Sequence, residues 1–235
     1  MTMMQRGLLA LSALLAVAYG AAGSGLYAGA PPFVLTALFK ASSIVALAII
    51  ALRAGGSRLL AAALLFGALG DALLAWSDDT FLAGAASFLI GHLFYIALFL
   101  SSGLGLRTLM QPARLLAALA LVAAAIVMTL WLVPTTHALF APLSIYTGVL
   151  TCMALASFTL PAARWLAMAG AVLFFASDGF VAATMFHPLE DPDLAYWRSF
   201  AGWMVYWAGQ AGLCIGALGL HRAPLESLVP DQSVS

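Results

Sequence analysis

Ionisable and polar side chains interrupt the apolar stretches of this chain at positions that could form one site. They are Lys40, Asp71, His92, Tyr95, Tyr146, Ser177, Asp178, Tyr206 and Gln210. A charged side chain inside an apolar stretch is costly, so it is expected to face the protein interior and to have a partner. Two carboxyl groups in such surroundings can act as one acid and one base or electrostatic stabiliser. We therefore predict a functional role for Asp71 and Asp178, which suit catalysis, although proton-coupled transporters use the same groups.

The balance of charge in this set leaves two arrangements open. With His92 neutral, Lys40 is one cation facing two carboxylates. The excess negative charge is relieved either by a proton held on one carboxyl group or by protonation of His92. Lys40 is expected to lie near at least one of the two aspartates.

The elements that position these residues are indicated by composition. Of 235 residues, 64% are hydrophobic and 8% are charged, whereas a soluble domain carries roughly a quarter charged residues. Lipid must therefore cover most of the surface, and we predict an all-α polytopic bundle in the cell inner membrane, forming one domain over residues 1–223. The formal net charge is zero, so no nucleic-acid partner is expected.

A membrane span needs about 20 mainly apolar residues, and the chain contains eight such stretches. They cover residues 7–23, 33–52, 59–76, 81–100, 113–133, 138–159, 163–186 and 199–220. Charges between them sort by side. Most arginines lie near the N-terminus, in every second connection and just after the last span. They are Arg6, Arg53, Arg58, Arg107, Arg114, Arg164 and Arg222. The other connections hold Asp78, Asp79, Glu190, Asp191 and Asp193, with Arg198.

This asymmetry follows the positive-inside rule and predicts that both termini are cytoplasmic. An even number of spans is then required. The first stretch could instead be a signal peptide, but seven spans would place the new terminus outside, so a retained first span is favoured. The polar tail, residues 224–235, is expected to be disordered.

Helical spacing groups several of the polar residues. Gly84, Phe88, Gly91, His92 and Tyr95 share one face of the fourth span, and Gly202, Tyr206 and Gln210 follow one line on the last. The spacing from Lys40 to Asp71 is 31 residues and that from Tyr146 to Asp178 is 32. This weak similarity in spacing suggests an internal repeat of two four-span halves. The halves would be parallel and related by an axis along the membrane normal.

Each polar residue also has a structural interpretation. Lys40 and an aspartate could form a structural ion pair, His92 could be a core histidine, and the tyrosines could link helices. Four tryptophans near the ends of the spans are expected to be anchors at the membrane interface, namely Trp76, Trp131, Trp197 and Trp203. A metal site made of Asp71, His92 and Asp178 is disfavoured because zinc generally takes more nitrogen or sulfur ligands, and no cofactor is expected.

The motifs around these residues resemble those of the YhhN-like lysoplasmalogenase family of multi-pass membrane enzymes. The matching segments run from about residue 33 to 220 and comprise residues 69–74, 81–84, 88–95, 174–178 and 206–210. Lys40 stands where the family has an intramembrane lysine, although Ala41 follows it here instead of the usual nearby proline. Gly179 also replaces a residue that is often larger or hydroxylated.

The resemblance implies hydrolysis of the vinyl-ether bond of a lysoplasmalogen, giving a fatty aldehyde and a glycerophospho-base. The substrate would be a lysophospholipid from the membrane. Asp71 and Asp178 would be the catalytic pair, and the other polar residues would hold the headgroup and water. The alternative is a proton-coupled transporter or lipid-binding membrane protein that uses the same buried cluster.

Overall fold

The computed structural model describes residues 1–22 and 33–220, which form eight α-helices without a β-strand in that part of the chain. The helices are α1 (Met3–Ala22), α2 (Phe33–Arg53), α3 (Arg58–Trp76), α4 (Phe81–Ser102), α5 (Pro112–Val127), α6 (Phe140–Ser157), α7 (Trp165–Phe186) and α8 (Pro192–Ala217). Short 3₁₀ turns lie at Asp78–Thr80, Leu106–Met110 and Ala162–Arg164. The helical fold class predicted from composition is confirmed, and the tail at 224–235 lies outside the described residues.

The helix α8 differs most from its predicted range, because it begins at Pro192 rather than near residue 199. Asp191 is the N-cap, and its Oδ1 accepts hydrogen bonds from the backbone N–H groups of Asp193 and Leu194 at 2.9 and 3.1 Å. Proline suits the first helical position because its missing N–H would have no partner there. The Asp191-Pro192 pair thus begins a helix, whereas the sequence pattern places it in a connection.

The predicted span at 113–133 is also not one regular helix. After α5 the backbone forms a π-helical turn, η3, over Met128–Leu132. Such turns are rare and often occur at functional sites. This one places Met128 and Thr129 on the wall of a cavity described below.

Seven of the eight described helices, all except α8, are long and apolar enough to cross a membrane. The helix α8 has sufficient length, but Arg198, Tyr206 and Gln210, together with several glycines, lower its apolar character. It nevertheless packs closely on α7: a Cβ on Gly212 would lie 3.0 Å from the Leu166 carbonyl oxygen. Small residues at such contacts let helix backbones approach. The eighth crossing stays a prediction.

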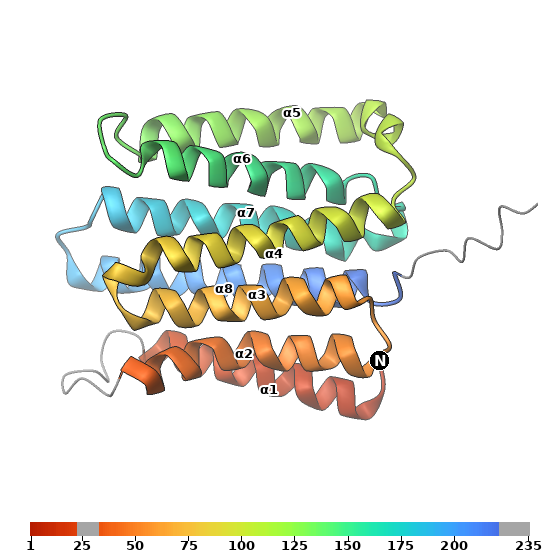
Figure 1. Ribbon diagram of the computed structural model, residues 1–235, viewed down its shortest axis with the longest axis horizontal. Coiled ribbons are helices and arrows are strands. Elements are labelled where there is room, and N and C mark those ends of the chain that lie inside the picture. Colours follow the sequence, from red (N-terminus) through yellow and green to blue (C-terminus); the bar gives the residue numbers. More distant parts are fainter. Residues whose placement is uncertain (23–32, 221–235) are drawn as a thin grey trace, which may run out of the picture.

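The helices run alternately along one direction, so successive connections lie at opposite ends (Figure 1). The helices α1 and α2 lie at one edge of the bundle and α5 and α6 at the other, with α3, α4, α7 and α8 between them. The start of α1 and the α2–α3, α4–α5 and α6–α7 connections share one end. Arg6, Arg53, Arg58, Arg107, Arg114 and Arg164 all belong to that end.

The helix α1 is packed as part of the bundle. The Ser12 hydroxyl donates a 2.7 Å hydrogen bond to the Ser43 carbonyl of α2. The indoles of Trp203 and Trp207 in α8 donate to the Ala16 carbonyl and to the Ser12 hydroxyl oxygen, at 2.8 and 2.9 Å. These hydrogen bonds join α1 to α2 and to α8.

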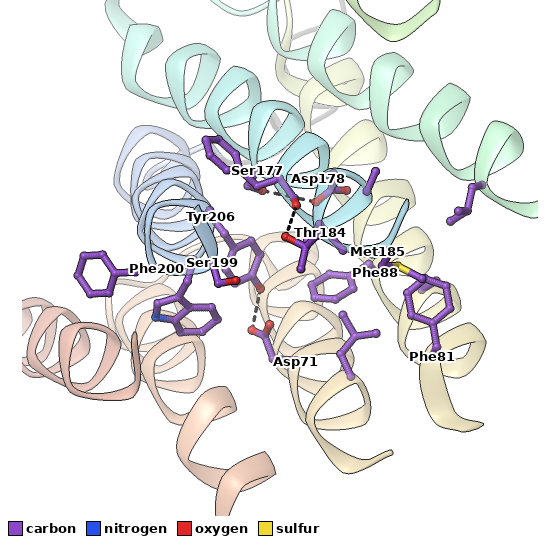
Figure 2. A pocket seen from close by; sticks show the side chains of 18 of the residues that line it. Asp71, Phe81, Phe88, Ser177, Asp178, Thr184, Met185, Ser199, Phe200 and Tyr206 are labelled. Atoms are coloured by element: carbon purple, nitrogen blue, oxygen red, sulfur yellow. Dashed lines mark hydrogen bonds between the residues drawn. The ribbon is translucent and has the colours of Figure 1, made fainter. Parts of the chain in front are cut away.

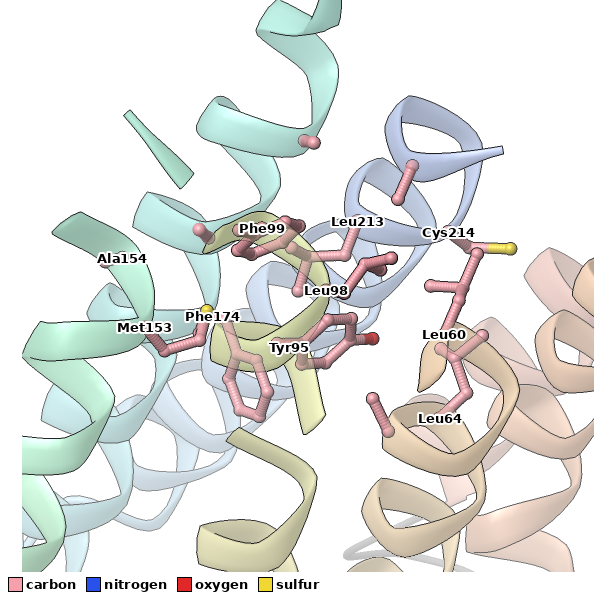
Figure 3. Close-up of a cluster of buried hydrophobic side chains, with 14 of the residues drawn as sticks. Leu60, Leu64, Tyr95, Leu98, Phe99, Met153, Ala154, Phe174, Leu213 and Cys214 are labelled. Carbon is pink, nitrogen blue, oxygen red and sulfur yellow. The ribbon is translucent and has the colours of Figure 1, made fainter. Parts of the chain in front are cut away.

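The apolar core lies toward the arginine-bearing end of α2, α3, α4, α6, α7 and α8. Figure 3 shows Tyr95, Leu98 and Phe99 of α4 among side chains of α3, α6, α7 and α8. Tyr95, Leu98 and Phe99 are each at most 1% exposed. This packed region fills the space between the helices around Tyr95, Leu98 and Phe99.

Candidate active site

A cavity of about 640 Å³ lies within the bundle and is lined by residues of α1, α2, α3, α4, α6, α7, α8 and η3. Thr184 and Met185 at the end of α7 and Pro192 and Ser199 at the start of α8 line it and are exposed. The cavity therefore opens at the α7–α8 end of the bundle. Figure 2 shows Asp71, Asp178 and Tyr206 entering it from three different helices.

Lys40 and Asp71 form the charged part of this cavity. Lys40 Nζ lies 4.0 Å from Oδ1 of Asp71, so the expected proximity of Lys40 to an aspartate is confirmed. Lys40 Nζ also lies 5.7 Å from the centroid of the Trp203 ring, within the range of a cation–π contact. Asp71 is 2% exposed. The ammonium group is therefore held between a carboxylate and an aromatic face.

Trp203 is a site residue that the sequence interpretation missed. We expected it at the membrane interface, but it lines the cavity from α8. The available signal was its position next to Gly202 and three residues before Tyr206, on the polar side of the helix. An extended start of α8 moves Trp203 away from the helix end, where an interface anchor would lie.

A chain of hydrogen bonds reaches Asp71 from behind the cavity wall. The Tyr206 hydroxyl donates to Oδ2 of Asp71 at 2.8 Å. The Gln210 amide donates to the Tyr206 oxygen at 3.2 Å, and the Tyr95 hydroxyl donates to the Gln210 carbonyl at 2.8 Å. Each hydroxyl has one hydrogen. Because the Tyr206 oxygen accepts from Gln210, its own hydrogen is directed to Asp71.

A second chain reaches Asp178. The Tyr146 hydroxyl donates to Oδ2 of Asp178 at 2.6 Å. His92 Nε2 lies 3.2 Å from the Tyr146 oxygen. Ser177 Oγ lies 3.4 Å from Oδ1 of Asp178 and donates to the Phe174 carbonyl at 2.6 Å. Each aspartate thus accepts a hydrogen bond from a tyrosine hydroxyl at one carboxyl oxygen. Each tyrosine oxygen in turn lies next to a side-chain nitrogen, of His92 or of Gln210.

Glycines next to the polar residues allow these chains to form. A Cβ on Gly67 would lie 2.7 Å from Gln210 Nε2, and a Cβ on Gly70 would lie 2.7 Å from the Phe88 ring. Either side chain would push α4 or α8 away from α3. The glycine before Asp71 therefore brings Phe88 against the carboxylate-bearing turn.

The nine residues singled out from the sequence fall into two groups. Lys40, Asp71, Tyr146, Ser177, Asp178 and Tyr206 line the cavity. His92, Tyr95 and Gln210 do not line it; they are at most 1% exposed and belong to the hydrogen-bond chains behind it. The predicted faces of α4 and α8 are confirmed, since Gly84, Phe88, His92, Tyr206 and Gln210 are all buried.

The remainder of the cavity wall is mainly apolar. Its apolar side chains include Leu74, Phe81, Ala85, Phe88, Met128, Val133, Leu143, Phe180 and Val181. This lining suits a hydrocarbon chain next to the carboxyl groups. Across the described part of the chain, no three His, Cys, Asp or Glu side chains are grouped as metal ligands.

Comparison with known families identifies the chain. The sequence model of the YhhN family matches residues 35–217, which is most of the chain. The resemblance found in the sequence motifs is thereby confirmed. Comparisons with curated proteins and with solved structures give no match.

Proposed function

The chain belongs to the YhhN family, and from this membership and its paired aspartates we propose that it is a membrane hydrolase that cleaves the vinyl-ether bond of lysoplasmalogens. The observation that carries this proposal is the joint presence of Asp71, Asp178 and Lys40 on the wall of one largely apolar cavity. A lysolipid has the matching parts: one hydrocarbon chain, a reactive bond near its end and a phosphate.

The chemistry needs two carboxyl groups. A vinyl ether hydrolyses when its β-carbon takes up a proton, which leaves an oxocarbenium-like centre that water captures. One carboxylic acid supplies the proton, and a second carboxylate stabilises the positive charge and orients the water, as in hydrolysis of glycosides by two carboxyl groups. The two aspartates supply both groups from α3 and α7.

The cavity also supports one orientation of the lipid. The phosphate would lie near Lys40 and Trp203, which belong to α2 and α8. The hydrocarbon chain would lie toward Phe81, Met128 and Leu143, where the wall is apolar. The vinyl-ether carbons then fall between the two regions, beside the carboxyl groups. Lipid would enter at the exposed end of the cavity, near the connection between α7 and α8.

The test is lipid mass spectrometry after incubation of purified protein with a lysoplasmalogen and with the ester lysolipid of the same chain length. We expect fatty aldehyde and glycerophospho-base from the vinyl ether and no change in the ester. The double variant Asp71→Asn/Asp178→Asn is the matched control. Intact vinyl ether with well-folded protein would refute the proposal. Movement of intact lipid between vesicles by that protein would favour the transporter alternative.

We further propose that the protein crosses the inner membrane eight times with both termini in the cytoplasm. The six arginines gathered at one end of the described bundle support this orientation, because positive charge is retained on the cytoplasmic side. It places the open end of the cavity, and both aspartates, toward the outer leaflet. Fusions that test this orientation are described in the Discussion.

Paired contacts support the proposed parallel repeat of α1–α4 and α5–α8. A Cβ on Gly91 of α4 would lie 3.1 Å from the Ala63 carbonyl oxygen, and one on Gly209 of α8 would lie 3.0 Å from that of Gly170. Ala63 and Gly170 each precede the aspartate of their helix by two turns. An experimental structure in which the two halves fail to superpose about an axis parallel to the helices would refute the repeat.

A further inference from the structure

We propose that the two aspartates carry different charges: Asp178 holds a proton, and Asp71 is ionised beside Lys40. Within the proposed hydrolase, on which this reading of the roles rests, Asp178 is then the acid and Asp71 the stabilising carboxylate. The sequence alone left open which aspartate was protonated, and whether His92 was protonated instead.

The first argument is the distribution of positive charge. Among the described residues, Lys40 is the only Lys, Arg or His that lines the cavity. Its amino group lies 4.0 Å from Asp71, whereas Asp178 has no cationic nitrogen within that distance in the described part of the chain. Ionised groups at membrane depth pair with one another, and an isolated carboxylate in apolar surroundings is neutralised by a proton. This places the excess proton on Asp178.

The second argument concerns His92. The Tyr146 hydrogen is donated to Asp178, so the Tyr146 oxygen can only accept from His92, and Nε2 must carry a hydrogen. His92 Nδ1 is buried without a hydrogen-bond partner among the described residues. A second ring proton there would bury an unpaired charged donor, which is more costly than an unpaired neutral acceptor. His92 is therefore neutral and does not compensate a charge on Asp178.

The third argument is the hydrogen available to Oδ1 of Asp178. Its one described polar neighbour is the Ser177 hydroxyl, at 3.4 Å. That hydroxyl has a single hydrogen, and its 2.6 Å contact with the Phe174 carbonyl is much the shorter. The serine oxygen is then free to accept, so Oδ1 can carry a proton. The other titratable side chains on this wall, among the described residues, are the tyrosines Tyr19, Tyr146, Tyr196 and Tyr206, which carry no positive charge.

These charges give a balanced reaction. The proton on Asp178 passes to the β-carbon of the vinyl ether, and the α-carbon becomes the oxocarbenium-like centre facing the Asp71 carboxylate. Water adds to that carbon and gives one proton to Asp71. The product of this addition is a hemiacetal. The hemiacetal breaks as Asp71 returns the proton to the leaving ether oxygen and the hydroxyl proton passes to Asp178. One water is consumed, and aldehyde and alcohol are formed.

The experiment is infrared spectroscopy of purified protein at neutral pH, in light and heavy water. A protonated carboxyl group gives a carbonyl stretch separate from that of carboxylates, and this band shifts on deuteration. We expect the band in the wild type and in Asp71→Asn, and we expect its loss in Asp178→Asn. The control variant Asp79→Asn changes an exposed residue outside the cavity and should keep the band.

Two substitutions keep the test decisive if Asp178→Asn does not fold. Tyr146→Phe removes the hydrogen bond to Asp178 and should raise the frequency of the band. Tyr206→Phe removes the corresponding bond to Asp71 and should leave the band in place. A wild type without the band, a band lost on Asp71→Asn, or a band moved by Tyr206→Phe alone would overturn the assignment.

The assignment and the activity fail separately. A protein with the expected band pattern that leaves lysoplasmalogen intact refutes the hydrolase and keeps the charge assignment. A protein that cleaves the vinyl ether but loses the band on Asp71→Asn keeps the activity and refutes the assignment.

Discussion

The ammonium group of Lys40 lies 4.0 Å from Oδ1 of Asp71, and both side chains are largely buried, at 17% and 3% exposed. The other oxygen of that carboxyl group accepts the Tyr206 hydroxyl. Asp71 is therefore held at both oxygens, by a cation on one side and a neutral donor on the other. This arrangement makes separate predictions for the pair and for each member.

Lys40→Met should destabilise the protein, because it leaves the buried Asp71 carboxylate without its cation. Breaking a buried ion pair from one side costs about 3 kcal/mol or more. The double variant Lys40→Met/Asp71→Asn removes both charges and should recover most of the lost stability while staying inactive. Thermal unfolding in detergent measures both effects. Equal stability of Lys40→Met and wild type would show that the 4.0 Å contact is not an energetically coupled pair.

Removing a tyrosine hydroxyl should lower turnover without unfolding the protein. Tyr146→Phe and Tyr206→Phe each delete one hydrogen bond to a catalytic carboxyl group. The Tyr206 bond is made to a carboxylate, and the Tyr146 bond becomes one as Asp178 gives up its proton in the reaction. A hydrogen bond to a charged group contributes about 1.5–3 kcal/mol, so turnover should fall by about tenfold to about a hundredfold in each variant. The control is Thr108→Val, which removes a hydroxyl that donates to the Gly105 carbonyl outside the cavity. Unchanged turnover in both variants would show that the tyrosines only link helices.

The sequence predicted His92 and Gln210 as groups that bind substrate, whereas the structure places them behind Tyr146 and Tyr206. If they act by orienting the tyrosines, His92→Leu and Gln210→Leu should lower kcat and leave KM nearly unchanged. His92→Gln retains an N–H donor and should recover part of the activity. Steady-state kinetics with a vinyl-ether lysolipid separate the two parameters. A rise in KM with unchanged kcat would instead show that these side chains touch the lipid.

Much of the fold could be predicted because lipid imposes a strong pattern on sequence. The helices α3 and α7 fall within a few residues of their predicted spans, since apolar length alone sets them. The predicted start of α8 was wrong because polar residues before position 199 indicated a loop. Asp191 and Pro192 are instead a good N-cap and first residue of a helix. The π turn after α5 has no comparable signature in its apolar residues.

The composition of the candidate site was predictable to a similar degree. Burying a charge is costly enough that Lys40, Asp71 and Asp178 stood out, and the structure brings them to one cavity. The position of a residue along a span does not indicate whether its side chain faces the cavity or a neighbouring helix. His92 and Gln210 therefore could not be separated from the cavity-lining residues until the packing of α4 against α6 and α8 was known.

The orientation of the bundle makes a further prediction. Reporter fusions at Gly105 and Pro224 should report the cytoplasm, and a fusion at Asp79 should report the outside. The reason is that arginines gather at the end of the bundle that holds the α4–α5 connection. Paired reporters that are active on opposite sides of the membrane provide the control at each site. An outside signal at Pro224 would contradict the crossing of α8, which is the least apolar of the eight helices.

The last prediction concerns the two aspartates as one unit. If Asp178 donates the proton and Asp71 stabilises the cation that forms, each group is useful only when the other is present. Asp71→Asn and Asp178→Asn should then each remove nearly all turnover, and the double variant should be little worse than either. Strong non-additivity of this kind is typical of residues that act in one step. The proteins should still fold, because asparagine has nearly the shape of aspartate and carries no buried charge.

Transfer of a proton to carbon should also make turnover slower in heavy water for the wild type. The rate of vinyl-ether cleavage should be measured for the wild type, both single variants and the double variant, each confirmed to be monodisperse in detergent. Additive losses would mean that the aspartates act in different steps. Retention of most turnover by a well-folded Asp178→Asn protein would exclude the carboxyl pair as the catalytic unit. Asp178 would then be a structural acceptor for the Tyr146 hydroxyl, to which it is bound at 2.6 Å.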